Sequence, residues 1–402
     1  MRILHTSDWH LGRTLHGYDL HEHHEAFHRE LLSTVIEQKV DVVVVPGDVY
    51  DRAVPPVQSV RLLSRILAQL ADHATVVLTS GNHDSPDRLG FGKEVMRSGV
   101  HILTDLPGIE HPVVVPDEHG EVLFFGLPYL EPDLVRDCLG QEGEERLERS
   151  HEAVMGAAMD RVRSTLAAHR AGAEGAGSGA SIRAVALAHA FISGGEASDS
   201  ERNISVGGVE TVPGSVFDGI DYVALGHLHG CQNLSSLLTG HEGRSRAMWY
   251  SGSPLPYSLS EKNHRKCMLL VDLGADGVTA VERIPITQPR RIVELRGSLQ
   301  ELLDQAPEHA EQWLYARVTD PQRPAQMQAT LRAAYPHLLA ALHEPEGREA
   351  LSVVPDVRAL QDPMQVMEEF VHHVTGHAVS DSEREVLEAA WRQVRAESQE
   401  AS

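Results

Sequence analysis

The chain has 402 residues, of which 42% are hydrophobic and 23% charged, and it carries a formal net charge of −23. This length exceeds what one hydrophobic core usually supports, and the ordinary composition excludes a mostly disordered chain. We therefore expect a large domain with at least one smaller companion. The acidic balance argues against binding nucleic acid through bulk charge, although two divalent cations at one site would make the local potential more positive.

The cysteine content and the N-terminal sequence indicate in which cellular compartment the protein is expected. Cys138, Cys231 and Cys267 are widely spaced and odd in number, which favours neither a disulfide framework nor a zinc site. The N-terminal residues run into a polar segment without an apolar stretch of the signal-peptide kind, and no later stretch is apolar for long enough to span a bilayer. We expect a cytoplasmic protein without a membrane anchor.

Residues 1–289 alternate short apolar runs with turns rich in Gly, Asp and His and with amphipathic stretches, which predicts an α/β fold. The expected buried strands are Ile3–Thr6, Val40–Val45, Thr75–Thr79, Leu123–Gly126, Ile182–Ala188 and Tyr222–Leu225. Helices that cover the sheet are predicted by the spacing of Val60, Leu63, Leu67 and Leu70, and of Val154, Ala158 and Val162. Three later runs lack intervening helices and predict antiparallel strands, at Met248–Ser251, Cys267–Leu273 and Val278–Ile284.

The remaining segments predict a loop and a second, smaller domain. Residues 171–180 have a low-complexity Gly/Ala sequence, typical of a flexible, solvated loop. Residues 290–356 predict a small α/β domain with the order strand, helix, strand, helix and a weaker strand, at Arg291–Leu295, Leu299–Asp304, Trp313–Val318, Ala325–Ala334 and Leu351–Val354.

Residues 357–402 carry two amphipathic helix patterns. The first begins at Asp362-Pro363 and stops at Gly376, and the second begins at a capping-box pair, Ser380 and Glu383. An apolar stripe indicates only that something covers it. Packing on their own domain and docking to a partner are therefore both open for these helices.

Polar clusters directly follow the C-terminal ends of five expected strands. They are Ser7–His10, Gly47–Asp51, Gly81–Asp84, His189–Ala190 and Gly226–His229. In an α/β sheet this edge forms ligand sites, so these residues are expected to converge on one crevice. Because positions i and i+2 of extended backbone point the same way, the D-x-H and H-x-H spacings should each aim two side chains into one cavity.

The side chains in these clusters are carboxylates, imidazoles and an amide, without thiolate. This mixture suits manganese, iron or zinc better than calcium. In two-metal phosphoryl chemistry the ions lie about 3.5 to 4 Å apart, and Asp48, alone on its turn, is the expected bridging carboxylate. A single histidine is more often a core or surface residue than a ligand, but five coincident clusters favour a metal site.

Two other groups of histidines are not expected to be ligands. His21, His23, His24 and His28 lie on an early polar helix, and His372 and His373 lie in the C-terminal tail. We interpret both groups as parts of solvated faces.

The order of the motifs resembles the signature of the calcineurin-like metallophosphoesterase superfamily, with matches at Asp8/His10, Asp48/Asp51, Asn82/His83, His189 and His227/His229. More narrowly, the chain is similar over nearly its whole length to the SbcD family of nuclease subunits, through HTSDWHLGRTLHG, VVVPGDVYDRAVPP, TSGNHDSPDRLGFG, DYVALGHLHG and SGSPLPYSLSEKNHRK. The resemblance implies a four-layer αββα nuclease domain at 1–289, a small α/β capping domain at 290–356, and C-terminal helices for a partner ATPase at 357–402.

The resemblance also implies a role for each site residue. One metal ion would be held by Asp8, His10, His229 and the shared Asp48, and the other by Asp48, Asn82, His189 and His227. We expect two divalent ions, with manganese as the first choice. His83 would be the catalytic histidine that is not a ligand. Related nucleases carry a histidine where this chain has Asp51, so no role transfers to Asp51, which is a candidate to orient His83 or a ligand.

The implied activity is metal-dependent hydrolysis of DNA, as a double-strand exonuclease and a single-strand or hairpin endonuclease. Activated water would attack phosphorus in line, while His83 stabilises the transition state or protonates the leaving oxygen. The implied partners are DNA, a second copy of the chain through Val57–Leu70 and Leu89–Met96, and an SbcC-type coiled-coil ATPase through Pro363–Ala396. Candidate phosphate contacts, which are equally explained as ordinary surface charge, are Arg13, His16, Arg88, Arg202 and Arg265.

Two alternatives remain open at this point. A protein phosphatase or cyclic-nucleotide phosphodiesterase of the same superfamily would share every metal ligand and differ only in the flanking segments. A non-catalytic scaffold would keep the fold and lose the metals. The SDWHLG start, the small domain and the helical tail favour the DNA enzyme, and the intact ligands with His83 argue against the scaffold.

Overall fold

A computed structural model of the chain describes residues 1–96, 99–140, 146–175, 182–201, 211–239, 243–345, 363–375 and 379–400. The chain divides into two compact units, Met1–Val293 and Glu294–Ser402. Across the described ranges, no helix combines the length and the apolar character that crossing a bilayer requires.

Unit 1 is built on two six-stranded sheets. The first has the order β14-β13-β1-β4-β5-β6, and its strands are β1 (Arg2–His5), β4 (Val42–Pro46), β5 (Thr75–Thr79), β6 (Val100–Leu103), β13 (Cys267–Gly274) and β14 (Gly277–Pro285). The second has the order β11-β12-β10-β9-β8-β7, and its strands are β7 (Val113–Asp117), β8 (Gly120–Leu127), β9 (Arg183–His189), β10 (Tyr222–Gly226), β11 (Gln232–Asn233) and β12 (Ala247–Tyr250). A separate ribbon pairs β2 (Thr14–Leu15) with β3 (Tyr18–Asp19).

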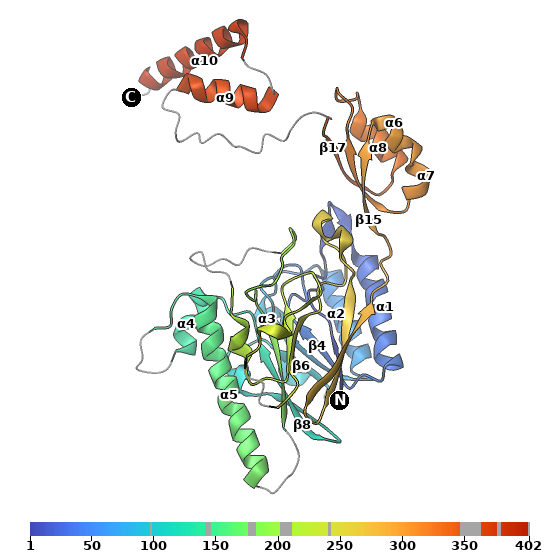
Figure 1. Cartoon of the computed structure of the whole chain (residues 1–402), viewed down its shortest axis with the longest axis vertical. Helices are drawn as coiled ribbons and strands as arrows, with labels where there is room; N and C mark the ends of the chain where they lie inside the picture. Colours follow the sequence, from blue (N-terminus) through green and yellow to red (C-terminus); the bar gives the residue numbers. More distant parts are fainter. Residues whose placement is uncertain are drawn as a thin grey trace. The chain divides into compact units, whose positions relative to one another are not determined.

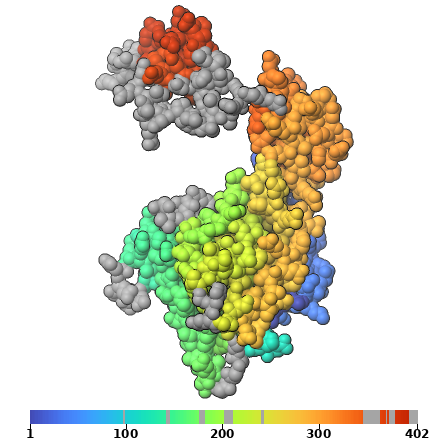
Figure 2. Space-filling view, viewed as in Figure 1, coloured from blue at the N-terminus to red at the C-terminus, as the bar shows by residue number. Residues whose placement is uncertain are grey.

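Helices cover the outer faces of both sheets. Those of the first sheet are α1 (His21–Glu37) and α2 (Val57–Leu70), and those of the second are α4 (Pro132–Leu139) and α5 (His151–Gly175); Figure 1 shows the two pairs on opposite sides of the strands. Figure 2, in the same view, shows α5 beside the yellow-green surface of the chain that follows residue 211. Shorter elements are α3 (Pro86–Leu89), η1 (Lys93–Val95), η2 (Pro107–Glu110), η3 (Gly214–Phe217), η4 (Ser235–Leu237) and η5 (Leu259–Asn263).

Strand β4 illustrates how alternation builds the layers. Val42 and Val44 lie in the core between the two sheets, whereas Val43 and Val45 lie in the core under α1 and α2. Successive side chains of a strand point to opposite faces, so a continuous apolar run such as this one is buried on both sides. The layers follow the order helix, sheet, sheet, helix, and the predicted α/β sandwich is confirmed.

Two expectations for unit 1 need correction. The strand at Met248–Ser251 was expected to be antiparallel, but β12 runs parallel to β10 and antiparallel only to the short β11. The sequence between β10 and β12 lacks a helical pattern, and this lack predicted antiparallel strands. The connection between these two parallel strands instead consists of β11 and η4, without a long helix. The expected loop at 171–180 is helical up to Gly175, since its alanines extend α5, and residues 176–180 lie outside the described ranges.

Unit 2 contains a three-stranded sheet of β15 (Ile292–Gly297), β16 (Trp313–Val318) and β17 (Leu338–His343), in that order. Helices α6 (Leu299–Asp304), α7 (Ala306–His309) and α8 (Met327–Ala334) accompany it, and a capping box of Ser298 and Glu301 begins α6. The sequence did not predict β17, and the strand expected at Leu351–Val354 lies outside the described residues.

Two further helices end the described chain. They are α9 (Pro363–Thr375) and α10 (Asp381–Glu400), and an ion pair of 3.0 Å between Arg384 and Glu368 joins them. The predicted helix stop at Gly376 lies outside the described residues.

Candidate metal centre

The ends of five strands, drawn from both sheets, bring the seven predicted ligands together. Asp8 and His10 follow β1, Asp48 follows β4, Asn82 follows β5, His189 ends β9, and His227 and His229 follow β10. Asn82 is half-buried, and the other six are at most 3% exposed. Burial of this many polar side chains requires that they satisfy one another or share a ligand.

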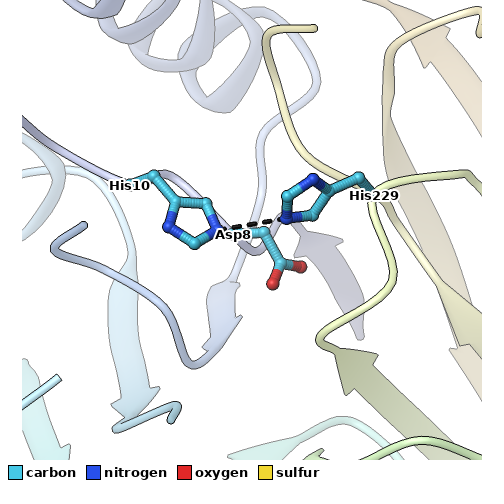
Figure 3. Close-up of side chains that lie close together, drawn as sticks. All are labelled: Asp8, His10 and His229. Atoms are coloured by element: carbon cyan, nitrogen blue, oxygen red, sulfur yellow. Dashed lines mark hydrogen bonds between the residues drawn. The ribbon is translucent and has the colours of Figure 1, made fainter. Parts of the chain in front are cut away.

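Asp48 lies at the middle of the cluster. Its Oδ2 lies 3.5 Å from His10 Nε2 and 3.6 Å from His189 Nε2. On one side, Asp8, His10 and His229 form a group in which the Nε2 atoms of the two histidines are 3.1 Å apart (Figure 3). On the other side, His189 Nε2 lies 2.9 Å from Asn82 Oδ1, and the His189 and His227 rings are 5.4 Å apart.

The backbone at these ligands is not extended, which corrects the reasoning from residue spacing. The φ angles of Asp8, His10, Asp48 and His227 are 54°, 46°, 48° and 107°. Such left-handed conformations cost about 1 to 3 kcal/mol each in residues other than glycine, and they persist only where the surroundings hold them. Here the N–H of Asp8 donates to the Gly47 carbonyl at 3.2 Å, and the N–H of His10 to the Asp48 carbonyl at 3.0 Å.

Glycines allow the loops to approach this closely. A Cβ at Gly81 would lie 2.2 Å from Asp48 Oδ1, and one at Gly226 would lie 2.0 Å from the Pro46 carbonyl oxygen. Neither contact is possible for a side-chain carbon, so these positions of the GNHD and GHLH motifs require glycine.

His189 Nε2 and Asn82 Oδ1 are arranged as two ligand atoms for a cation. The Pro46 carbonyl, 3.0 Å from His189 Nδ1, only accepts hydrogen bonds, so Nδ1 carries the ring proton and Nε2 presents a lone pair. Asn82 Oδ1, 2.9 Å away, is also an acceptor. Two acceptors that face each other at this distance repel, and a metal ion between them turns the repulsion into coordination.

The ionisable groups of the cluster support the same interpretation. Burial, and next the neighbouring His229, lower the pKa of His10 well below its ordinary value, and burial does the same for the pKa of His227. These rings are therefore neutral, as metal ligands must be. Burial, and next Asp48, raise the pKa of Asp8 well above its ordinary value. A divalent cation would relieve the repulsion between these two carboxylates.

His83 lies beside the cluster, where Asp51 orients it. Its Nδ1 donates to the Asp51 carbonyl at 2.7 Å, its main-chain N–H donates to Asp48 Oδ1 at 2.9 Å, and its Nε2 lies 3.8 Å from Asp48 Oδ2. The Asp51 carboxylate lies 3.6 Å from His10 Nδ1 and 3.5 Å from the Arg13 guanidinium. Asp51 therefore contacts both His83, through its main chain, and a predicted ligand, through its side chain.

The expectation of a solvated histidine face on α1 is wrong. His23, His24 and His28 are at most 7% exposed, the His28 ring packs edge-on against Trp9 at 4.7 Å, and His24 Nε2 lies 3.3 Å from the Tyr257 hydroxyl. The signal was present in the spacing 24, 27, 28, 31, which places two histidines on the stripe of Phe27 and Leu31. The side chains of His372 and His373 lie outside the described part of the chain.

Asp84 has a structural role that the sequence did not reveal. Its carboxylate accepts the N–H groups of Val49, Tyr50 and Gly81 at 3.1, 2.8 and 2.9 Å. It thereby joins the loop after β4 to the loop after β5. Burial, and next Asp48, raise the pKa of Asp84 to about 7.

The five candidate phosphate contacts differ in their surroundings. Arg13 donates to the Ser200 carbonyl at 2.9 Å, and Arg88 donates to the Ala53 carbonyl at 2.9 Å, so both have intramolecular partners. His16 and Arg265 are exposed, and Arg202 lies outside the described residues.

Comparison with known proteins identifies the family. The calcineurin-like phosphoesterase family matches residues 1–137, and the type 5 capsule protein repressor C-terminal domain matches residues 288–375. The SbcD subunit of the nuclease SbcCD from Rhodobacter capsulatus is 36% identical over 311 residues, which cover 73% of this chain and 71% of that protein. The chain belongs to the SbcD family. Like that family, it is a metal-dependent phosphodiester hydrolase and a nuclease subunit of the SbcCD type, as the sequence predicted.

Two solved structures are more distantly similar to this SbcD-family chain. A Thermus thermophilus protein is 14% identical with a TM-score of 0.36, over 70% of this chain and 98% of its own. GAP50, the anchor in the inner membrane complex of Plasmodium, is 10% identical with a TM-score of 0.36, over 86% of this chain and 98% of its own. At these scores the likenesses do not establish a shared fold.

Proposed function

We propose that this chain cleaves DNA by two-metal hydrolysis at the centre around Asp48. Asp8, His10, His229 and Asp48 would hold one ion, and Asp48, Asn82, His189 and His227 would hold the other. The position of Asp48 carries the proposal. Its Oδ2 lies 3.5 Å from Nε2 of His10 on one side of the centre and 3.6 Å from Nε2 of His189 on the other.

Two divalent ions bound there supply Lewis-acid activation of water and neutralise charge that develops on the phosphate oxygens. The chain itself positions His83. Because the Asp51 carbonyl holds the Nδ1 proton, Nε2 is the atom that faces the substrate space beside Asp48. Protonated at Nε2, His83 donates a hydrogen bond to a phosphate oxygen or gives its proton to the leaving oxygen.

We propose manganese as the metal and double-stranded DNA ends and hairpins as the substrates, within the cytoplasm. Carboxylate, imidazole and amide ligands without thiolate suit this metal. Since the chain has a formal charge of −23, DNA binding depends on the ions and on local basic groups more than on bulk charge. Strong dependence of DNA binding on the metal is therefore part of the proposal.

A homodimer through α2 and the segment after α3 belongs to the same proposal. Val57 and Val60 are 67% and 44% exposed, and Phe91 and Val95 are 83% and 87% exposed. The bond from Arg88 to the Ala53 carbonyl ties the two segments together. Large exposed apolar side chains are typical of an interaction surface, and a second copy of the chain would bury these.

We propose further that residues 290–356 cap the DNA path and that α9 and α10 dock on the SbcC-type ATPase. Phe370 on α9 and Val386 on α10 are 66% and 67% exposed, which leaves apolar surface on both helices available to a partner. Docking of amphipathic helices in an apolar groove is a common mode of recognition.

The test is cleavage of labelled duplex ends and hairpins in manganese, with and without the ATPase subunit, alongside a phosphopeptide and a cyclic nucleotide as rival substrates. We expect metal-dependent DNA cleavage that Asp48→Ala abolishes. Efficient phosphopeptide hydrolysis without DNA cleavage would overturn the assignment of the substrate.

A further inference from the structure

We propose that Ser200 and Glu261 are positioning residues that fix the tautomer of His229 and so direct its Nε2 lone pair into the centre. The proposal rests on the proposed role of His229 as a metal ligand. Neither residue is a predicted ligand: Ser200 lies outside the quoted motifs, and Glu261 lies in the SGSPLPYSLSEKNHRK segment, to which the sequence assigned no role.

A short relay of hydrogen bonds links the three side chains. The Ser200 hydroxyl lies 2.6 Å from His229 Nδ1 and 2.5 Å from Glu261 Oε1. All three residues are buried, with exposures of 9%, 1% and 1% for Ser200, Glu261 and His229. Water therefore does not substitute readily for any partner in the relay.

Counting protons fixes the direction of both bonds. A hydroxyl has one proton, and an ionised carboxylate only accepts, so Ser200 donates to Glu261 and accepts from His229. A ring that offers a lone pair to a metal carries a single proton, which in His229 is consequently on Nδ1, and the lone pair is on Nε2. This is the atom that lies 3.1 Å from His10 Nε2, in the group with Asp8 (Figure 3).

Lys266 keeps Glu261 in its charged form. The Lys266 ammonium pairs with Glu261 Oε2 and also donates to Ser253 Oγ at 2.8 Å and to the His229 carbonyl at 2.9 Å. The Tyr257 N–H donates to Glu261 Oε1 at 3.0 Å. A buried carboxylate with a paired cation and these donors is stabilised as the acceptor that the relay needs.

Hydrogen bonds hold the segment around Ser200 against the clusters Ser7–His10 and Gly226–His229. Arg13, which follows the first motif, donates to the Ser200 carbonyl and stacks over the Tyr257 ring at 4.8 Å. Glu201 Oε1 accepts the main-chain N–H of His229 at 2.8 Å. The segment thus holds His229 by its ring and by its backbone, whereas the His189 ring is held directly by the Pro46 carbonyl.

The experiment compares three single variants and one double variant of the full chain. Ser200→Ala removes the relay, Ser200→Thr restores a hydroxyl, and Ser260→Ala is the matched control. Ser260 is exposed and accepts the Asp199 N–H at 3.0 Å, so this control loosens the same segment without touching His229. Calorimetric titration with Mn²⁺ alone gives the affinity and stoichiometry, and long-range ¹H–¹⁵N NMR of the metal-free protein gives the tautomer of His229.

We expect the Nδ1–H tautomer of His229 in the wild type and a tautomer mixture in Ser200→Ala. The affinity of one Mn²⁺ site should fall about 10- to 100-fold in Ser200→Ala, be restored in Ser200→Thr, and be unchanged in Ser260→Ala. The paired substitution Glu261→Leu with Lys266→Met, which removes the acceptor and its cation together, should repeat the loss. An Nε2–H tautomer in the wild type, or an unchanged affinity in Ser200→Ala, would overturn the relay.

The same data separate the relay from the metal centre. If the wild type binds no Mn²⁺, the proposed centre fails, and the relay that rests on it fails too. If the wild type binds two ions and Ser200→Ala binds them equally well, only the relay fails. The wild-type NMR measurement decides the tautomer even if a variant does not fold.

Discussion

Lowering the pH from 7 to 5 should destabilise unit 1 through the buried histidines of α1. Burial lowers the pKa of His24 and of His28 from 6.5 to about 3. Between pH 7 and pH 5, His24 and His28 bind protons in the unfolded chain but stay neutral in the folded chain. The stability that comes from keeping these rings neutral is therefore complete above pH 6.5 and is lost as the pH falls towards 3.

The size of the effect follows from the shift. For a group that titrates at 6.5 when unfolded and at about 3 when folded, the free energy of unfolding falls by about 2 kcal/mol between pH 7 and pH 5. His24 and His28 together then contribute about 4 kcal/mol, a large part of the 5 to 15 kcal/mol that typically stabilises a domain.

The assay is urea unfolding of the metal-free protein at both pH values, with His28→Phe as the test variant. Phenylalanine keeps an aromatic ring against Trp9 and removes the titrating group. The loss of stability between pH 7 and pH 5 should be smaller by about 2 kcal/mol in the variant. His21→Gln, on the more exposed side of the same helix, is the control and should behave as the wild type. The reasoning is refuted if His28→Phe loses as much stability as the wild type.

Three further outcomes are expected. His83→Ala should lower nuclease turnover about 10²- to 10⁴-fold and keep its manganese, since His83 is not a ligand; metal analysis showing depletion would contradict this. Val57→Glu should convert a dimer into a monomer in sedimentation velocity, because it charges the exposed patch on α2, and an unaltered mass would exclude that interface. Gly81→Ala should lose manganese binding, because its Cβ would lie 2.2 Å from Asp48 Oδ1, and calorimetry that finds wild-type affinity would disprove the close packing.

The sequence predicted nine strands of unit 1, because each is a short apolar run that ends in a turn, but it missed β6, β7 and the two-residue strands β2, β3 and β11. Thr75–Thr79 is the clearest case, since prediction and structure agree at both ends. The direction of a strand was harder to predict than its position. We predicted β12 as antiparallel, but it runs parallel to β10, because direction depends on the connection between strands and not on the local sequence pattern. β17 was missed because its sequence, LLAALH, has no alternation that separates a strand from a helix.

The sequence predicted that the candidate ligands converge, but it did not predict their backbone geometry. The seven expected ligands lie together, as the strand-end argument required, but at left-handed φ angles that the spacing argument had not anticipated. His24 and His28 were wrongly predicted to be solvent-exposed, because α1 is rich in polar residues. The two histidines lie on the same buried face of the helix as Phe27. Ser200 lies outside every quoted motif, and Glu261 and Lys266 lie in SGSPLPYSLSEKNHRK without an assigned role, so only the fold shows that they contact His229.

The most direct test of the metal centre is anomalous diffraction from crystals of the protein grown with manganese. Two peaks about 3.5 to 4 Å apart are expected, with Asp48 bound to both. One should lie against Asp8, His10 and His229, and the other against Asn82, His189 and His227. A single peak, or two peaks that do not share Asp48, would contradict the account.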